Sequence, residues 1–283
     1  MTTTTARLRS AAGRAKRAAR TRWQSITAGP LPSDHQPVFI LGHQKAGTSA
    51  IAALLGEYTG LSATIDLKQE IRDLLIPRIV SGQADLEDLI KRNREEFAAP
   101  IVKHPNLTLI YPSLRLRFPE SQFVFVVRDP RDNIRSILDR LDLPGDLETI
   151  DDEHWAALPR PWRLILGEGQ PGWERRTYLE ALADRWAGMV RTYLEHRNQM
   201  HLIRYEDFRE AKETEIANLA RSLRLPAAAD ISKSVDQPFQ QRGMNRNIPV
   251  GEFFGPHNLR RIEDRCQSEM HQIGYEPQGD AGA

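Results

Sequence analysis

The stretch that decides the fold of this chain is Pro37-Val38-Phe39-Ile40-Leu41-Gly42-His43-Gln44-Lys45-Ala46-Gly47-Thr48-Ser49. Its apolar run from Val38 to Leu41 is too short for a helix and is bounded by proline and glycine, which predicts a buried strand. Apolar residues then recur at helical spacing from Ile51 to Leu55. The pattern therefore predicts a strand, a short polar loop and a helix.

The loop between this strand and this helix is suited to bind an anion. Backbone N–H groups point outward at a helix N-terminus, and the helix dipole favours negative charge there. Gly42 and Gly47 let the backbone approach a bulky oxyanion. Thr48 and Ser49 add hydroxyl donors, and Lys45 adds a positive charge. The plainer alternative is an ordinary turn that carries a surface lysine.

The loop differs from the phosphate-binding loop of nucleotide triphosphatases. That motif requires a glycine, four residues, a second glycine, and then lysine and serine or threonine. Gly42 and Gly47 have this separation, but Thr48 stands where the lysine belongs, and the lysine lies inside the loop as Lys45. The loop therefore indicates an anion site that differs from that of a nucleotide triphosphatase.

The composition of the 283 residues excludes several classes of protein. The 39 basic and 38 acidic residues give a net charge of +1, so nothing indicates a nucleic-acid partner. The single cysteine, Cys266, rules out an intramolecular disulfide and suits a reducing compartment. No run of ~18 apolar residues is present, so no transmembrane segment is expected. These observations favour a cytoplasmic protein.

Residues 1–33 form a basic segment that contains no acidic residue. No apolar region follows the basic start, as a signal peptide would require. A flexible tail, a contact with anionic lipid at the cytoplasmic face of a membrane, and an organelle transit peptide remain open. Residues 34–283 are expected to form a single domain. The basic residues of the segment are Arg7, Arg9, Arg14, Lys16, Arg17, Arg20 and Arg22.

Three more apolar stretches predict strands, at residues 101–105, 121–127 and 200–205. The continuous apolar run from Phe123 to Val127 is typical of a central strand buried on both faces. Strands that alternate with helices predict an α/β fold, in which helices flank a P-loop-like central parallel sheet in three layers.

The remaining segments are assigned from the spacing of their apolar residues and from the proline and glycine residues that interrupt helices and strands. Residues 143–172 are rich in proline and glycine and predict an irregular insertion or lid. Trp155, Trp162 and Trp173 lie in or beside it and either stack on a sugar or aromatic ligand or pack internally. A polar loop is expected at 238–256. Helices are expected at 68–75 with a break at Pro77, and at 85–97, 107–118, 173–197, 214–223 and 259–273.

A second strand-loop-helix unit also has the character of an anion site. Arg128 leaves the end of the strand at 121–127, and Ser136 lies two turns into the following helix. Arg140 follows one turn later on the same helical face. Arg131 and Arg135 are expected to be solvated or structural.

Together these stretches resemble the sulfotransferases that use 3′-phosphoadenosine-5′-phosphosulfate (PAPS). Residues 42–49 are similar to the 5′-phosphosulfate loop of that family, and residues 125–136 are similar to its 3′-phosphate motif. Residues 103–105 and 203–208 resemble two weaker signatures. The layout is closest to the Golgi-type and bacterial branch, which includes tyrosylprotein and carbohydrate sulfotransferases, although no signal anchor is visible here.

The resemblance implies transfer of a sulfuryl group from PAPS to a hydroxyl or amine of a glycan, peptide, lipid or small molecule. Lys45 and Lys103 are expected to stabilise the negative charge that grows on the bridging oxygen. No metal is expected to be required. The residues expected to bind the donor are Gly42, Lys45, Ala46, Gly47, Thr48, Ser49, Arg128, Ser136 and Arg140.

The general base has more than one candidate. The resemblance favours Glu70, because members of that branch have a glutamate after the first helix. His104 is the alternative base that the amino-acid chemistry suggests without the resemblance, since the ordinary pKa of histidine suits proton transfer near neutral pH. Asp66 and His43 are further candidates. The choice among the four depends first on which side chain lies within reach of the acceptor, and only then on its pKa.

Two other classes of function remain as alternatives. A P-loop kinase or nucleotide triphosphatase would need Mg²⁺ and an adjacent Gly-Lys-Ser/Thr sequence. A non-catalytic nucleotide-binding module would keep the loops without turnover. The joint presence of Lys45, Lys103 and Arg128 argues against such a module.

Overall fold

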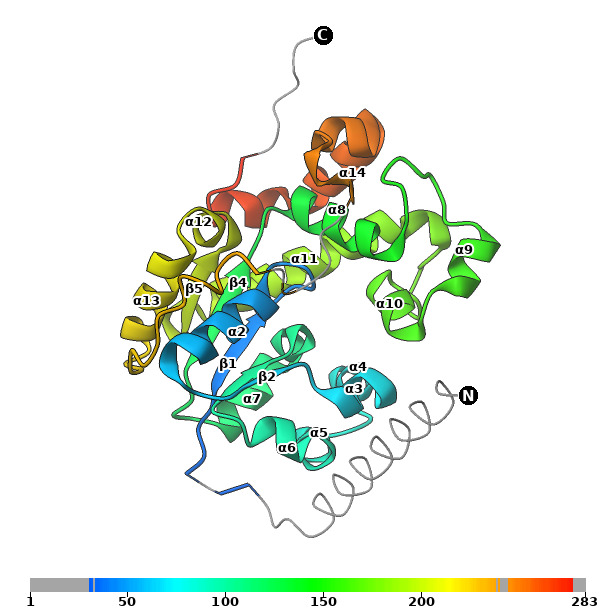
Figure 1. Ribbon diagram of the computed structural model, residues 1–283. Coiled ribbons are helices and arrows are strands. Elements are labelled where there is room, and N and C mark those ends of the chain that lie inside the picture. The colour runs from blue at the N-terminus through cyan, green and yellow to red at the C-terminus, as the bar shows by residue number, and fades with distance from the viewer. Residues whose placement is uncertain (1–30, 33, 238, 240–243, 277–283) are drawn as a thin grey trace, which may run out of the picture.

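A computed structural model describes residues 31–32, 34–237, 239 and 244–276, so almost all of the basic segment 1–33 lies outside the described residues. Five parallel strands form one sheet in the order β2-β3-β1-β4-β5 (Figure 1). The predicted α/β fold with a central parallel sheet is confirmed. The strands are β1 (Val38–Gly42), β2 (Ala63–Ile65), β3 (Ile101–Lys103), β4 (Phe123–Val127) and β5 (Met200–Arg204).

Alternate side chains of the central strands enter separate cores on the two faces of the sheet. On β1, Phe39 and Leu41 belong to one core, whereas Val38 and Ile40 belong to the other. Every residue of β4 is buried, as its apolar run predicts for a strand that is covered on both faces.

Helices cover both faces and complete the three layers. The face of Ile40 packs against α2 (Thr48–Thr59), α12 (Tyr205–Glu210) and α13 (Lys212–Ser222). The face of Phe39 packs against α7 (Tyr111–Arg117), α8 (Pro130–Leu141), α11 (Tyr178–Glu195) and α14 (Val250–Gln272). No helix among the described residues is both long and apolar enough to cross a membrane.

The sheet topology creates a crevice between β1 and β4. These two strands are neighbours, but the helices that follow them, α2 and α8, pack on opposite faces of the sheet. Ligands bind in such a crevice, outside the carboxyl ends of the strands, in open α/β sheets. Both predicted anion-binding loops therefore meet at this point.

The predicted break at Pro77 is wrong. The helix from residue 68 ends earlier, as α3 (Lys68–Asp73), because Leu74 adopts a left-handed conformation with φ 51°. A new helix, α4 (Leu75–Val80), then starts, and Pro77 lies in its first turn. Proline is tolerated there because the first N–H groups of a helix have no intrahelical partner.

Other predicted helices are shorter than expected. The helix at 85–97 is split into α5 (Leu86–Arg92) and α6 (Arg94–Phe97), because Asn93 uses its side chain to accept from the backbone N–H groups of Gln69 and Glu70. The start of the helix predicted at 107–118 is the 3₁₀ helix η1 (Pro105–Ile110), which leads into α7. The helix predicted at 173–197 begins only after a 3₁₀ turn, η2 (Arg175–Thr177).

The loop predicted at 238–256 is also partly wrong. Residues 238 and 240–243 lie outside the described residues, but α14 already begins at Val250 because Phe253 and Phe254 are buried in the core. Gly255, with φ 67°, kinks this helix before Pro256. The sequence signal at Pro256 therefore marks a kink, and the helix starts earlier.

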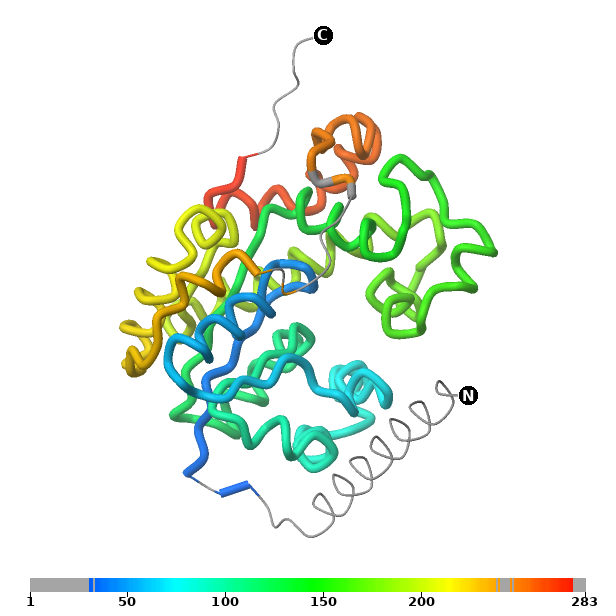
Figure 2. Tube along the Cα trace, in the orientation of Figure 1, coloured from blue at the N-terminus to red at the C-terminus, as the bar shows by residue number. Residues whose placement is uncertain are grey.

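Residues 143–172 are less irregular than predicted. They contain α9 (Asp152–Ala157), which Asp151 caps, and α10 (Arg160–Ile165). Figure 2 shows this segment, in green, at one side of the molecule, away from the strands. Its helix α10 packs against α11.

A buried ion pair joins α8 to the last helix. Arg131 donates to both carboxylate oxygens of Asp129, to Oε1 of Glu263 on α14 at 2.8 Å, and to the carbonyl oxygen of Glu276. Arg135 pairs with Asp132 and donates to the carbonyl oxygen of Ile248. Both arginines are therefore structural and buried, and neither is solvated.

Candidate active site

The loop after β1 has an unusual backbone that its residues make possible. Gly42 has φ 140°, and a Cβ atom at this position would lie 2.4 Å from the carbonyl oxygen of Val126 on β4. Lys45 and Gly47 also have positive φ, at 65° and 96°. The tight turn that results brings the loop back to the N-terminus of α2.

Tyr205 lies directly over this loop. A Cβ atom on Gly47 would be 2.4 Å from the ring of Tyr205, so only glycine fits. The guanidinium group of Arg128 lies 4.8 Å from the centroid of the same ring and donates through Nη1 to the carbonyl oxygen of Lys45 at 3.2 Å. Arg128 is thus held between the loop and an aromatic face. Sequence reasoning gave Tyr205 no role.

A cleft of about 1360 Å³ opens at the crevice between β1 and β4. Gly42 and Ala46 do not line it. The N–H of Gly42 donates to Thr108 Oγ1 at 3.0 Å, and the N–H of Ala46 faces the carbonyl oxygen of His43 at 3.3 Å, so both of these backbone donors are engaged within the protein. The other residues expected to bind the donor do line it: Lys45, Gly47, Thr48, Ser49, Arg128, Ser136 and Arg140.

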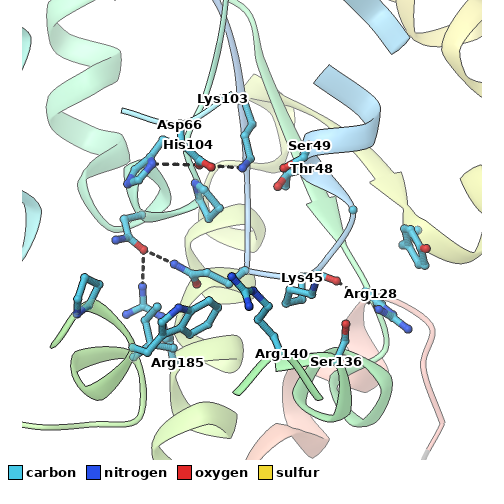
Figure 3. Close-up of a pocket in the computed structure, with 18 of the residues that line it drawn as sticks. Lys45, Thr48, Ser49, Asp66, Lys103, His104, Arg128, Ser136, Arg140 and Arg185 are labelled. Carbon is cyan, nitrogen blue, oxygen red and sulfur yellow. Dashed lines mark hydrogen bonds and ion pairs between the residues drawn. The ribbon is translucent and has the colours of Figure 1, made fainter. Parts of the chain in front are cut away.

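The side of the cleft that is lined by Lys45, Arg128 and Arg140, called the donor side below, carries several positive charges. Burial lowers the pKa of Lys45, and the nearby charges of Arg140 and Arg128 lower it further. Figure 3 shows Lys45 between the end of β1 and α8, which presents Ser136 and Arg140. Several cations that mutually destabilise their charged forms favour an anionic ligand, because such a ligand would relieve their repulsion.

Asp66 joins two of the predicted catalytic side chains (Figure 3). Its Oδ1 atom accepts from Nζ of Lys103 at 2.8 Å and lies 3.3 Å from Nδ1 of His104. Asp66 has φ 116°, a conformation that non-glycine residues rarely adopt. Although burial acts in the opposite direction, the hydrogen bonds from His104 and Lys103 lower the pKa of Asp66.

His104 follows β3 and is buried beside the cleft. Burial lowers the pKa of His104 below 6.5, while Asp66 acts to raise it. Its Nε2 atom is buried and has no hydrogen-bond partner among the described residues. A neutral imidazole with one unsatisfied nitrogen is therefore present at the wall of the cleft.

Glu70 lies at the same cleft but is engaged in a structural role. Its carboxylate accepts from the backbone N–H groups of Leu75, at 2.7 Å, and of Ile76, at 3.1 Å, and so caps α4. Only 1% of Glu70 is exposed. Burial raises its pKa to about 7, against the effect of the two backbone hydrogen bonds.

The other base candidate, His43, does not line the cleft. It is buried, its Nδ1 atom lies 3.1 Å from the carbonyl oxygen of Gln44, and burial lowers its pKa to about 3. A histidine with a pKa this low that does not line the cleft is a poor acceptor of a substrate proton.

Arg185 on α11 is a cleft residue that sequence reasoning missed. Its Nη2 atom donates to Oδ1 of Asn106 at 2.8 Å. A sequence signal was available, because Arg185 lies three residues after Leu182 and four before Met189, both of which are buried. A charged residue on the apolar face of a helix indicates a functional or paired cation.

The three tryptophans near the insertion differ in their roles. Trp155 and Trp173 pack against each other with ring centroids 4.7 Å apart, and Trp173 donates to the carbonyl oxygen of Leu166. Only Trp162 of the three lines the cleft. Within the described part of the chain, no group of three or more histidine, cysteine or acidic residues could hold a metal ion.

The sequence matches the family described as the sulfotransferase domain over residues 35–251. The chain belongs to the sulfotransferase family. No curated protein sequence matches this sulfotransferase.

Solved structures of bacterial sulfotransferases share the fold. Sulfotransferase STF9 from Mycobacterium avium matches with a TM-score of 0.55 and 12% identity, over 93% of this chain and 82% of that chain. Sulfotransferase STF1 from Mycobacterium tuberculosis H37Rv matches with a TM-score of 0.54 and 12% identity, over 89% of this chain and 81% of that chain. This sulfotransferase therefore has the fold of those enzymes despite little identity of sequence.

Proposed function

We propose that this protein transfers a sulfuryl group from PAPS to a hydroxyl or amine of an acceptor. The observation that carries the proposal is the convergence of Lys45, Arg128, Ser136 and Arg140, from two separate strand-loop-helix units, and of Lys103, from the end of β3, on one cleft. Such a cleft offers cationic groups to both ends of a nucleotide that carries two anionic groups.

The residues present fit such a donor. The turn at Gly47, which no side chain could enter, leads to the N-terminus of α2 with Thr48 and Ser49, and would hold the 5′-phosphosulfate. Arg128, Ser136 and Arg140 would hold the 3′-phosphate. The buried Nε atom of Arg128 has no partner among the described residues, which leaves it available for this contact.

The bound donor supplies an activated sulfuryl group whose S–O bond to the bridging oxygen breaks as the acceptor oxygen or nitrogen bonds to sulfur. Negative charge then grows on the bridging oxygen, and Lys45 would stabilise it as a fixed cation. Lys103, held by Asp66, would act beside it. Such preorganised contacts are worth on the order of 3–4 kcal/mol in the transition state.

We assign the general base to His104, with Asp66 as its orienting partner, in place of Glu70, which the family resemblance favours. A carboxylate oxygen 3.3 Å from Nδ1 favours a proton on that nitrogen, which leaves the lone pair of Nε2 for the acceptor proton. The backbone N–H of Leu67 donates to Nδ1 at 3.4 Å, which favours the opposite tautomer, but a charged carboxylate oxygen at 3.3 Å is the stronger partner. Glu70 remains the rival, although its carboxylate is occupied by the cap of α4.

Titration with adenosine 3′,5′-bisphosphate and with ATP, each with and without Mg²⁺, tests this function by thermal stabilisation of the protein. We expect the bisphosphate to stabilise the protein more than ATP does and without Mg²⁺. A preference for ATP with Mg²⁺ would instead support a kinase or nucleotide triphosphatase. An acceptor screen with labelled PAPS then tests turnover, and bisphosphate binding without any transfer would support a non-catalytic module.

A further inference from the structure

Arg185 is a cation without a carboxylate partner in a largely buried position. Among the described residues it forms no ion pair, and its Nη2 atom reaches only the amide oxygen of Asn106. That oxygen also accepts from Nε2 of Gln44, so Asn106 is shared. The Nε atom of Arg185 is buried and has no hydrogen-bond partner among the described residues. Burial lowers the pKa of Arg185 to about 10, and no neighbouring acid opposes this effect.

A buried charge is costly unless it is paired. Structural arginines elsewhere in this chain meet that requirement, since Arg131 contacts Asp129 and Glu263, and Arg261 contacts Glu180. Arg185 differs from them because it lines the cleft and leaves its charge uncompensated by the protein. An anion that enters the cleft would supply the missing partner.

The position of Arg185 places this anion on the acceptor side. The positive charge of Arg185 acts to lower the pKa of His104, the proposed base. The pKa of Lys45 is lowered mainly by burial and by Arg140 and Arg128, with Lys103 as a smaller cause. Figure 3 shows the same division, with Arg185 and Arg128 on opposite sides of Lys45.

The elements around Arg185 present several apolar side chains to the cleft, together with the polar Asn106. Helices α10 and η1 both pack against α11. They contribute Trp162 and Leu164 from α10, and Leu109 from η1, to the lining of the cleft. An acceptor with an apolar body and one anionic end would bury the body against these side chains and place its charge at Arg185.

We propose that Arg185 binds an anionic oxygen group of the acceptor, so that the protein prefers acceptors that carry a carboxylate or phosphate at one end and the reacting hydroxyl at the other. This proposal rests on the proposed sulfuryl transfer and deepens it by naming the class of acceptor. Arginine suits the task because its planar fork binds such groups through two parallel hydrogen bonds.

The test uses the full chain saturated with adenosine 3′,5′-bisphosphate and measures acceptor binding by calorimetry. The ligands are ω-hydroxyalkanoates of increasing chain length, the matching ω-hydroxyalkanamides, and the monophosphate esters of the matching diols. We expect the best charged ligand to bind on the order of 10- to 100-fold more tightly than its amide, the range given by a charge-assisted hydrogen bond. The carboxylate and phosphate series show which anion the site prefers.

Variants on one helix then locate the effect. Arg185→Met should abolish the preference for the charged ligand, and Arg185→Lys should retain part of it. Arg191→Met is the matched control, because Arg191 lies on the same helix with an exposed side chain that pairs with Glu269 outside the cleft.

Three outcomes would overturn the proposal: equal binding of amides and charged ligands, no binding of any member, or a loss of bisphosphate affinity in Arg185→Met with acceptor preference unchanged. The last outcome would assign Arg185 to the donor. If the wild-type protein does not bind the bisphosphate at all, the proposed function itself has failed, and this result is distinct from the other three.

Discussion

The carboxylate of Asp66 lies 2.8 Å from the ammonium group of Lys103, and the same oxygen faces His104. One side chain therefore contacts both Lys103, the proposed transition-state cation, and His104, the proposed base. We expect Asp66→Asn to lower kcat by on the order of 10²–10⁴-fold, the usual contribution of a positioned base. Bisphosphate affinity should be unchanged, because Asp66 does not belong to the donor side.

A matched control for this variant is Asp184→Asn, which removes an exposed carboxylate paired with Arg265. It should leave kcat near the wild-type value. Asp66→Glu should recover part of the activity if orientation is the role of this residue. Full activity in Asp66→Asn would show that neither Lys103 nor His104 depends on this contact.

The pH dependence of turnover separates the two candidate bases. A base must be deprotonated, so kcat/KM rises with pH through its pKa in the free enzyme. Burial holds the pKa of His104 below 6.5, whereas it raises the pKa of Glu70 to about 7. We expect half-maximal activity below pH 6.5, and near-complete loss of activity in His104→Ala but not in Glu70→Gln. A midpoint near pH 7 that disappears in Glu70→Gln would identify Glu70 instead.

Glu70 should also make stability depend on pH. Its pKa is raised from 4.5 to about 7 in the folded protein, so the folded state binds the proton more tightly than the unfolded state does. This contribution is complete below pH 4.5 and is lost as pH rises through about 7. Relative to Glu70→Gln, the wild type should therefore lose free energy of unfolding over this range, on the order of 3 kcal/mol by the cost per pKa unit. Urea unfolding at several pH values measures it, and a constant difference between the two proteins would contradict it.

Replacement of Lys45 and replacement of Arg128 should impair different steps, turnover in the first case and donor binding in the second. Lys45→Ala should lower kcat by on the order of 10²–10³-fold, since it removes a cation at the growing charge. Arg128→Ala should mainly weaken bisphosphate binding, because Arg128 is fixed beside the loop at Lys45 and Tyr205. Single-turnover kinetics and calorimetry distinguish the two effects. Near-normal turnover in Lys45→Ala would refute its role.

Gly47→Ala should disrupt the loop. The new Cβ atom would meet the ring of Tyr205 at 2.4 Å in a backbone conformation with φ 96°. We expect bisphosphate affinity to fall by roughly tenfold or more, because such strain costs about 1–3 kcal/mol. Gly82→Ala is the control, since Gly82 has a similar φ of 73° but nothing within 4 Å of the added atom. Equal effects of the two substitutions on affinity would argue against the contact with Tyr205.

The parts of the site that are local in sequence could be predicted. The strand and loop at 38–49 follow from a short apolar run and two glycines, and the unit from Phe123 to Ser136 follows in the same way. Both strands lie in one parallel sheet, so their carboxyl ends had to meet. The confirmed fold therefore brings seven of the nine residues expected to bind the donor to one cleft, whereas Gly42 and Ala46 do not line it.

The remaining features depend on contacts between distant segments. The helix end at Leu74 is set by its left-handed backbone and by the carboxylate of Glu70, which caps the next helix instead of pointing freely into the cleft. The link from Asp66 to Lys103 spans 37 residues. Arg185 could have been noticed from its helical face, but its lack of a carboxylate partner is a property of the folded protein alone.

The buried contact between Arg131 and Glu263 has a consequence for how the protein can be divided. Similarity to the family ends at residue 251, whereas α14, which carries Glu263, continues to Gln272. A fragment that stopped at residue 251 would keep every side chain assigned to the reaction. It would lack Glu263, so α8, which presents Ser136 and Arg140, would lose its ion pair with α14. It would also uncover apolar surface at Ile262 and Met270. The segment that matches the family is thus shorter than the segment that folds as one unit, and we expect activity to require the longer one.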